Sequence, residues 1–206
     1  MTDELRPAGD DHPAAIPLAV VVPVKAFELA KGRLADTLDP DARAELARRM
    51  TAGVLKAADP LPRWVVCEAD DVARWAIDAG ASVIRQDRPG LNPGVTEAVA
   101  ELGARGVQRV IVAHGDLPLA ASLAWVGDFD GVTVVPDRRG DGTNVLAVPT
   151  GTDFTFAYGR GSAEAHWAEA ERCGLAARMV HDESLGWDVD LPDDLTVFEI
   201  VPARSE

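Results

Sequence analysis

The chain has 206 residues, of which 47% are hydrophobic and 26% charged, and its formal net charge is -14 at pH 7. This length and composition predict one globular domain, while the strong negative charge argues against a nucleic-acid partner. No apolar run approaches the roughly 20 residues that cross a bilayer, so we expect no membrane partner. Because the chain carries this net negative charge, an anionic substrate would need a local group of cations or a metal ion.

The beginning of the chain predicts no regular structure. Residues 1–16 include the acidic segment MTDELRPAGDDHPAA, lack the apolar stretch of a signal peptide and are expected to form a disordered leader. Cys67 and Cys173 lie far apart and have no metal-ligand spacing, which indicates thiols in a reducing cytosol. We therefore expect a cytoplasmic protein with one domain over residues 17–206.

Apolar runs and turn signals alternate along the rest of the chain. Strands are predicted at 18–22, 64–67, 82–84, 109–113, 132–135, 145–148 and 177–180, with a strand end at 187–190. Helices are predicted at 70–79, 96–104 and 162–173, and another opens at Asp39-Pro40, which fits an N-cap and the first helical position. Repeated β-α units imply a single-domain α/β fold with a mostly parallel central sheet. Ligands of such sheets bind at the carboxyl ends of the strands.

The loop after the first strand carries three cations, Lys25, Lys31 and Arg33, in an otherwise acidic chain. Fixed cations offset the charge of a polyphosphate, so this group predicts a phosphate-binding loop. The patterns GxxxxGKS/T and GxGxxG are both absent, which excludes the common phosphate and dinucleotide loops. A solvated surface loop is the alternative explanation.

Three carboxylates follow predicted strands. Asp116 comes directly after one strand, and Asp188 and Asp190 are expected on the same face of the final strand end. Neighbouring carboxylates repel one another unless a cation lies between them, and magnesium takes oxygen ligands, so these residues predict a magnesium site. For Asp116, a turn or a helix cap is the alternative explanation. Asp193 and Asp194 are expected in the first turn of a helix, not at the metal.

Three further loops, at 86–94, 137–144 and 158–162, combine glycine with amide or hydroxyl side chains. Glycine lets the backbone approach a ligand closely, and Asn92 offers both donor and acceptor groups. Free backbone N–H groups before the helix at Ser162 can bind an anion. Each loop also fits an ordinary turn, hairpin or helix cap, and for 86–94 the turn is the simpler explanation.

Taken together, the segments resemble a known family, the 2-phospho-L-lactate or phosphoenolpyruvate guanylyltransferases of coenzyme F-420 biosynthesis. The matching segments stand in the order of that family: VPVKAFELAKGRL, GLNPG, DLPL, DGTNVLAVP, YGRGSAEAH and DVDLPDDL. They span nearly the whole chain after residue 17. Two departures concern His114-Gly115, where a small or acidic lead-in to DLP is more usual, and Arg160, which interrupts the glycine-Ser segment.

The resemblance implies a GT-A-like, Rossmann-like nucleotidyltransferase fold and a role for each loop. The residues expected to hold magnesium are Asp116, Asp188 and Asp190. Those expected to act in catalysis, mostly by facing the triphosphate, are Lys25, Lys31, Arg33 and Asp116. Those expected to bind the phosphorylated acid are Thr143, Gly159, Gly161 and Ser162. Those expected near the nucleoside are Val22, Pro23, Val24, Gly90 and Asn92.

The implied reaction joins GMP from GTP to a small phosphorylated three-carbon acid. A phosphate oxygen of the acid attacks the α-phosphorus of GTP and pyrophosphate leaves, so positioning and charge neutralisation carry catalysis. A composition rich in Ala, with Arg far more frequent than Lys, hints at a GC-rich bacterium and favours phosphoenolpyruvate over 2-phospho-L-lactate and 3-phosphoglycerate. The alternatives are a nucleotidyltransferase with another acceptor, a GT-A-type glycosyltransferase and a non-catalytic nucleotide sensor. The oligomeric state stays open at this point.

Overall fold

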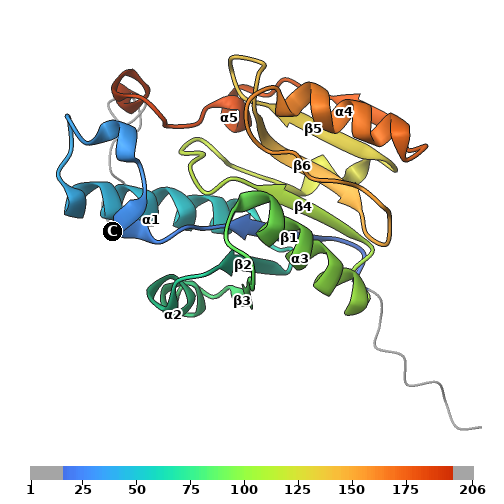
Figure 1. Cartoon of the computed structure of the whole chain (residues 1–206), viewed down its shortest axis with the longest axis horizontal. Coiled ribbons are helices and arrows are strands. Elements are labelled where there is room, and N and C mark those ends of the chain that lie inside the picture. The colour runs from blue at the N-terminus through green and yellow to red at the C-terminus, as the bar shows by residue number, and fades with distance from the viewer. Residues whose placement is uncertain (1–15, 197–206) are drawn as a thin grey trace, which may run out of the picture.

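The computed structural model describes residues 16–196, in which one seven-stranded sheet lies between helices on both of its faces (Figure 1). The strands are β1 (Ala19–Pro23), β2 (Arg63–Cys67), β3 (Ser82–Arg85), β4 (Arg109–Ala113), β5 (Val132–Pro136), β6 (Thr143–Pro149) and β7 (Ala177–Met179). The helices are α1 (Pro40–Ala57), α2 (Asp70–Asp78), α3 (Leu91–Ala104), α4 (Ser162–Arg172) and α5 (Glu183–Gly186). Short 3-10 helices are η1 (Phe27–Leu29), η2 (Gly32–Leu34), η3 (Ala124–Asp128) and η4 (Pro192–Thr196).

The strand order is β3-β2-β1-β4-β6-β5-β7, and every neighbouring pair is parallel except the two that contain β6. The prediction of a mostly parallel sheet is therefore confirmed. Because β6 runs against its neighbours, it begins at the edge of the sheet where the parallel strands end. Thr143, the first residue of β6, thus lies at the same edge as the end of β4, and the backbone N–H of His114 donates to the carbonyl of Asn144 at 3.0 Å.

The two faces of the sheet have separate hydrophobic cores. Val20 and Val21, successive residues of β1, face opposite cores: α1 and α2 cover the first face, and α3 and α4 cover the second (Figure 1). Apolar side chains on both faces are typical of a parallel sheet covered by helices. The side chain of Asp39 accepts a hydrogen bond from the Ala42 N–H at 2.8 Å, which confirms the predicted start of α1.

Most predicted elements agree with the structure to within a residue or two, but helix α3 does not. It begins at Leu91, not at residue 96. Gly90 adopts a φ of 109° directly before the helix, a conformation that glycine tolerates and other residues avoid. Pro93 lies in the first turn, where its missing N–H has no helical partner to lose. The prediction treated this proline as part of a turn, whereas the structure uses it inside the helix.

The predicted strand end at 187–190 is wrong. The structure has no strand there, and the N–H groups of Asp190 and Leu191 donate to a carboxylate oxygen of Asp194, at 2.8 and 2.7 Å. Because these N–H groups bond to a side chain, the segment forms a loop between α5 and η4 and does not join the sheet. Strand alternation therefore does not place Asp188 and Asp190 on one face, and the shape of the loop determines their positions.

The predicted disordered leader lies outside the described residues, except for Ile16. That residue forms a parallel bridge with Val107, with a hydrogen bond of 3.1 Å from its N–H to the carbonyl of Gly106, so it belongs to the margin of the sheet. None of the helices within 16–196 is both long and apolar enough to span a membrane.

Candidate active site

A cavity of about 1150 Å³ lies along the edge of the sheet at which β1 and β4 end and β6 begins. Its walls come from the loops that follow the strands, from α1 and from the loop at 188–191. Most of the predicted site residues line this cavity: Pro23, Val24, Lys25, Lys31, Arg33, Gly90, Asp116, Thr143, Gly159, Ser162, Asp188 and Asp190. Three others, Val22, Asn92 and Gly161, do not line it.

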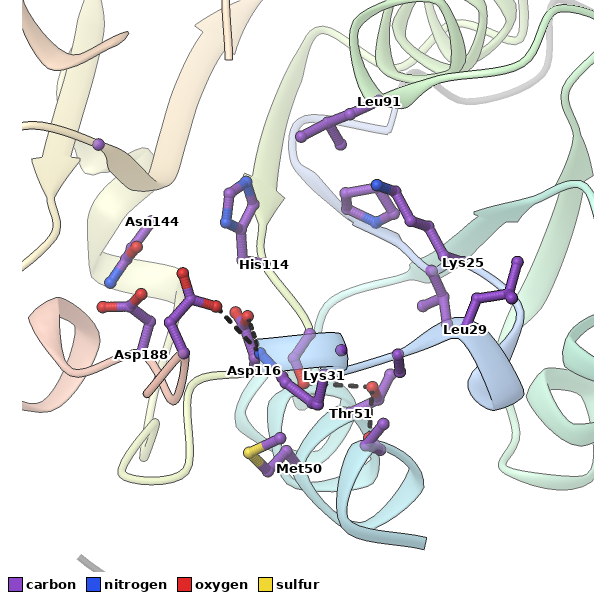
Figure 2. A pocket seen from close by; sticks show the side chains of 18 of the residues that line it. Lys25, Leu29, Lys31, Met50, Thr51, Leu91, His114, Asp116, Asn144 and Asp188 are labelled. Atoms are coloured by element: carbon purple, nitrogen blue, oxygen red, sulfur yellow. Dashed lines mark hydrogen bonds and ion pairs between the residues drawn. The ribbon is translucent and has the colours of Figure 1, made fainter. Parts of the chain in front are cut away.

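Lys31 connects two of the predicted carboxylates across the cavity. Its ammonium lies 2.5 Å from Oδ2 of Asp116 and 3.6 Å from Oδ1 of Asp190, while Nη1 of Arg33 lies 3.0 Å from Oδ2 of Asp190. Figure 2 shows Lys31 pointing at Asp116, whereas Lys25 points toward Leu91 and away from the carboxylates. The cation loop and the carboxylates predicted separately from the sequence are therefore parts of one site.

The backbone and the charge of Lys31 both mark it as unusual. Its φ of 54° and ψ of 41° place a non-glycine residue in the left-handed region, which persists only where surrounding contacts hold it. Its side chain is only 9% exposed. Burial acts to raise the pKa of Asp116, but the Lys31 ammonium and its hydrogen bond outweigh burial and hold that pKa below its ordinary value. Asp116 is therefore ionised at neutral pH.

Asp188 has the opposite electrostatic environment. Burial, followed by the nearby charges of Asp116 and Asp190, raises the pKa of Asp188 to about 6. Among the described residues, the closest cation is Arg139, whose Nη1 lies 4.0 Å from Oδ1 of Asp188, which is too far for a hydrogen bond. Asp188 is therefore a buried carboxylate whose charge is poorly compensated, and a cation bound beside it would stabilise its ionised form.

Magnesium fits these carboxylates by donor chemistry, although the side chains do not form a preformed cage. Within residues 16–196, no group of three or more His, Cys, Asp or Glu side chains lies close enough together to hold a metal ion. The Lys31 ammonium lies between Asp116 and Asp190 instead. Oδ1 of Asp116 and Oδ1 of Asp188 are buried without a hydrogen-bond partner among the described residues. Since magnesium binds through one or two carboxylates plus phosphates, such unsatisfied oxygens are suitable ligands.

A buried polar cluster forms the opposite wall of the cavity. Oγ of Ser162 lies 3.2 Å from Oγ1 of Thr143, and Oγ1 of Thr143 lies 3.0 Å from Nδ1 of His166. The N–H of Ala157 donates to Nε2 of the same histidine at 3.0 Å. Sequence reasoning missed His166, although its position four residues after Ser162, on the same face of a predicted helix, was a usable signal.

Two predicted ligand-binding residues have structural roles instead of facing the cavity. The Asn92 side chain accepts a hydrogen bond from the Tyr158 N–H at 2.7 Å and donates to the Tyr158 carbonyl at 3.3 Å, so it ties α3 to the loop before α4. Gly161 is the N-cap of α4 with a φ of 72°, and its N–H donates to a carboxylate oxygen of Asp141 at 3.2 Å. Neither residue lines the cavity, and these hydrogen bonds hold the segments around α3 and α4 together.

Asp194 organises the loop that carries Asp190. It is fully buried, it accepts the hydrogen bonds from Asp190 and Leu191, and it forms ion pairs with Arg138 and Arg139. The prediction that Asp194 lies in a first helical turn is confirmed by η4, but its positioning role was missed. The available signal was the Arg138-Arg139 pair, two cations in a polar loop of an acidic chain.

His114 contributes a neutral ring to the cavity. It points inward between Asn144 and Leu91 (Figure 2), and its ring centroid lies 5.2 Å from that of Tyr158. Burial lowers its pKa below the ordinary value for histidine, which keeps the ring uncharged at neutral pH. The cavity thus combines cations, carboxylates, buried hydroxyls and a neutral imidazole, a set that can bind two anions side by side and bring them together.

Comparison with known proteins agrees with this chemistry. A family model described as "Guanylyl transferase CofC like" matches residues 18–201. A phosphoenolpyruvate guanylyltransferase of Conexibacter woesei is 37% identical over 198 residues, covering 89% of this chain and 88% of that protein. One of Chloroflexus aggregans is 31% identical and covers 84% of this chain and 92% of its own. A 3-phospho-D-glycerate guanylyltransferase of Phenylobacterium zucineum is 34% identical, and the match covers 80% of this chain and 82% of that protein.

Solved structures share the fold at lower sequence identity. A putative nucleotide-diphospho-sugar transferase from Desulfovibrio desulfuricans superposes with a TM-score of 0.69 at 17% identity, covering 92% of this chain and 89% of that one. A nucleotidyl transferase from Methanothermobacter thermautotroptrophicus gives a TM-score of 0.62 at 16% identity, and the match covers 90% of this chain and 97% of that one. The predicted GT-A-like nucleotidyltransferase fold is thereby confirmed.

Proposed function

We propose that this chain, which belongs to the CofC-like guanylyltransferase family and is a nucleotidyltransferase, joins GMP from GTP to a small phosphorylated three-carbon acid and releases pyrophosphate. We favour phosphoenolpyruvate as the acid, because relatives at 31% and 37% identity carry that name. 2-Phospho-L-lactate remains an alternative from the family resemblance, and 3-phosphoglycerate from a relative at 34% identity. The product then serves coenzyme F-420 biosynthesis.

The observation that carries the proposal is the contact between Lys31 and Asp116 inside a cavity that also holds Thr143 and Ser162. The triphosphate of GTP lies against the cations Lys25, Lys31 and Arg33. The phosphorylated acid lies on the hydroxyl wall formed by Thr143, Gly159 and Ser162. The nucleoside occupies the side of the cavity near Val24 and Gly90.

The chemistry needs no covalent bond to the protein. A phosphate monoester is largely ionised at neutral pH, so its oxygen attacks the α-phosphorus without a strong general base. The new phosphorus–oxygen bond forms as the bond to the bridging oxygen of pyrophosphate breaks. Fixed cations and hydroxyls hold both anions in line for this displacement. Lys31 can neutralise phosphate oxygens, because it lines the cavity and its side chain is held there by Asp116 and Asp190.

Magnesium is part of the same proposal, with Asp116, Asp188 and Asp190 as its protein ligands. When bound, the ion reduces the repulsion between the two anionic substrates. The unpartnered buried oxygens of Asp116 and Asp188 support this assignment. A cytoplasmic location completes the proposal, and it is supported by the two free cysteines, Cys67 and Cys173.

The test is a pyrophosphate-release assay that combines each of phosphoenolpyruvate, 2-phospho-L-lactate and 3-phosphoglycerate with each of GTP, ATP, CTP and UTP. We expect release with GTP and phosphoenolpyruvate, in the presence of MgCl₂. Discrimination among bases is expected because a mismatched base leaves buried polar groups unpaired. Equal rates with ATP and GTP contradict the nucleotide assignment. Release of a nucleoside diphosphate from a nucleotide sugar, without pyrophosphate, contradicts the reaction class and favours a glycosyltransferase.

A further inference from the structure

We propose that His166 sets the direction of the hydrogen bonds at the Thr143–Ser162 pair, so that this pair presents a hydrogen atom to an anionic oxygen in the cavity. His166 is a positioning residue in this proposal, because it acts through Thr143 and does not touch the substrate. The inference deepens the acid-binding part of the proposed function and rests on it. The tautomer of His166 can also be measured in the substrate-free protein, without any turnover.

The protonation state of His166 follows from its two partners. The ring is fully buried on α4, and both ring nitrogens have a neighbour. A backbone N–H can only donate, so the N–H of Ala157, 3.0 Å from Nε2, requires that nitrogen to be unprotonated. The neutral imidazole then carries its hydrogen on Nδ1, which lies 3.0 Å from Oγ1 of Thr143. Nδ1 is therefore the donor and the threonine hydroxyl the acceptor.

The surroundings of the ring support the neutral form. Its neighbours are aromatic: the centroid of Tyr158 lies 4.8 Å away in an edge-to-face arrangement, and that of Phe154 lies 6.0 Å away. Burial lowers the pKa of His166 to about 4, with His114 adding to the decrease and Glu169 opposing it. The imidazole is therefore uncharged at neutral pH, and its tautomer is decided by the Ala157 N–H alone.

The remaining hydrogens of the two hydroxyls can then be counted. Thr143 and Ser162 have one hydroxyl hydrogen each, and the 3.2 Å contact between their oxygens uses one of the two. The Nδ1–H of His166 supplies a third hydrogen, so one hydroxyl hydrogen has no partner within the cluster. Both residues are only 1% exposed, yet both line the cavity, so this hydrogen is available to a ligand there. The pair is a hydrogen-bond donor toward the cavity.

The opposite tautomer would reverse this outcome. If Nδ1 of His166 accepted a hydrogen from Thr143, the contact with Ser162 would use the remaining hydroxyl hydrogen, and the pair would turn only lone pairs toward the cavity. Lone pairs repel a carboxylate or phosphate oxygen and accept from an amide, amine or alcohol instead. The tautomer of His166, which takes no part in the reaction, thus determines that the Thr143–Ser162 pair favours an anionic oxygen.

Two substitutions of His166 distinguish its hydrogen bond to Thr143 from its hydrogen bond with Ala157. His166→Asn can keep a donor near the Nδ1 position, whereas His166→Gln keeps an amide near Nε2 and loses the donor toward Thr143. We expect His166→Gln to raise the KM of phosphoenolpyruvate on the order of 10-fold or more, with the KM of GTP nearly unchanged, because one hydrogen bond to a charged group is weakened. We expect His166→Asn to recover part of that loss. His181→Gln, the same change at an exposed histidine, is the matched control.

The direct readout is the tautomer of His166 in the substrate-free wild-type protein. Long-range ¹H–¹⁵N correlation spectra, assigned by comparison with His166→Gln, should show a protonated Nδ1 and an unprotonated Nε2. A protonated Nε2 overturns the inference, whatever the enzyme's activity. So does a folded His166→Gln protein whose KM for phosphoenolpyruvate is unchanged while the wild type is active. Wild-type protein that releases no pyrophosphate with any of the acids contradicts the proposed function instead, and leaves the tautomer assignment intact.

Discussion

Lys31 and Asp116 are 85 positions apart in the sequence, yet the lysine ammonium lies 2.5 Å from a carboxylate oxygen of the aspartate. Lys31 lies in the loop that follows β1, and Asp116 in the loop that follows β4. These two strands are neighbours in the sheet, so the strand order brings the loops together. The lysine offsets the negative charge of a group of carboxylates that would otherwise repel one another.

The acidic group should be essential for turnover. Asp190→Asn removes a charge that pairs with Lys31 and Arg33, and we expect turnover to fall on the order of 100-fold or more while the melting temperature stays close to that of the wild type. Steady-state pyrophosphate release and a thermal melt measure the two effects. Asp193→Asn, an exposed neighbour in the same segment, is the control and should be active. Near wild-type rates with the same magnesium dependence would show that Asp190 is not a metal ligand.

Removing the lysine should destabilise the fold. Lys31→Met leaves Asp116 and Asp190 without the cation between them, and we expect the free energy of unfolding to decrease by roughly 1–3 kcal/mol. MgCl₂ should restore part of this loss, because a divalent ion can replace the ammonium. Urea unfolding with and without MgCl₂ tests both statements, with Lys25→Met as the control for loss of a cation. The interpretation is wrong if neither the midpoint in urea nor its response to MgCl₂ changes.

The ionised carboxylate of Asp188 should lower the free energy of unfolding at neutral pH. Its folded-state pKa of about 6 lies above the ordinary value of 3.8, so the folded state binds more protons between these values and stability decreases as the pH rises through them. Asp188→Asn carries no such charge, and we expect it to be more stable than the wild type by roughly 1–3 kcal/mol at about pH 7.5, yet inactive.

Urea unfolding at about pH 7.5 and about pH 4 measures this effect, and the difference between the Asp188→Asn variant and the wild type should nearly vanish at the lower pH. Asp78→Asn, at an exposed position of α2, should show no stabilisation at either pH. A variant that is less stable than the wild type at the higher pH would mean that Asp188 is compensated by a partner such as Arg139.

Thr143 should act on the acid and not on GTP. Thr143→Val removes the hydroxyl that joins Ser162 to His166 while keeping the volume of the side chain, so we expect the KM of phosphoenolpyruvate to rise on the order of 10-fold. Thr143→Ser keeps the hydroxyl and should retain most of the affinity. Initial rates with each substrate varied in turn separate the two KM values. An equal rise in the KM of GTP would place Thr143 at the nucleotide.

The sequence alone was sufficient for the architecture and for the prediction that cations and carboxylates lie near one another. The alternation of apolar runs and helical segments predicted a mostly parallel sheet, and Asp39-Pro40 predicted the start of α1, because such preferences depend on residues within a few positions of one another. Loops at the ends of parallel strands share one edge of the sheet, so the cations and carboxylates could be expected near one cavity.

Only the tertiary structure decided which of these residues are in contact and how they are protonated. The loop at Asp188 and Asp190 is held by the buried carboxylate of Asp194, and its shape depends on bonds that no strand periodicity encodes. The contact of Lys31 with Asp116 depends on the strand order, and the proposed tautomer of His166 depends on the N–H of Ala157, in the segment that leads into α4. The contact of Lys31 with Asp116 joins residues far apart in the chain, and it forms only when packing brings their strands together. The bonds of Asp194 and His166 span only a few residues, but they depend on the path that packing imposes on a loop, and hydrophobic periodicity carries no record of that path.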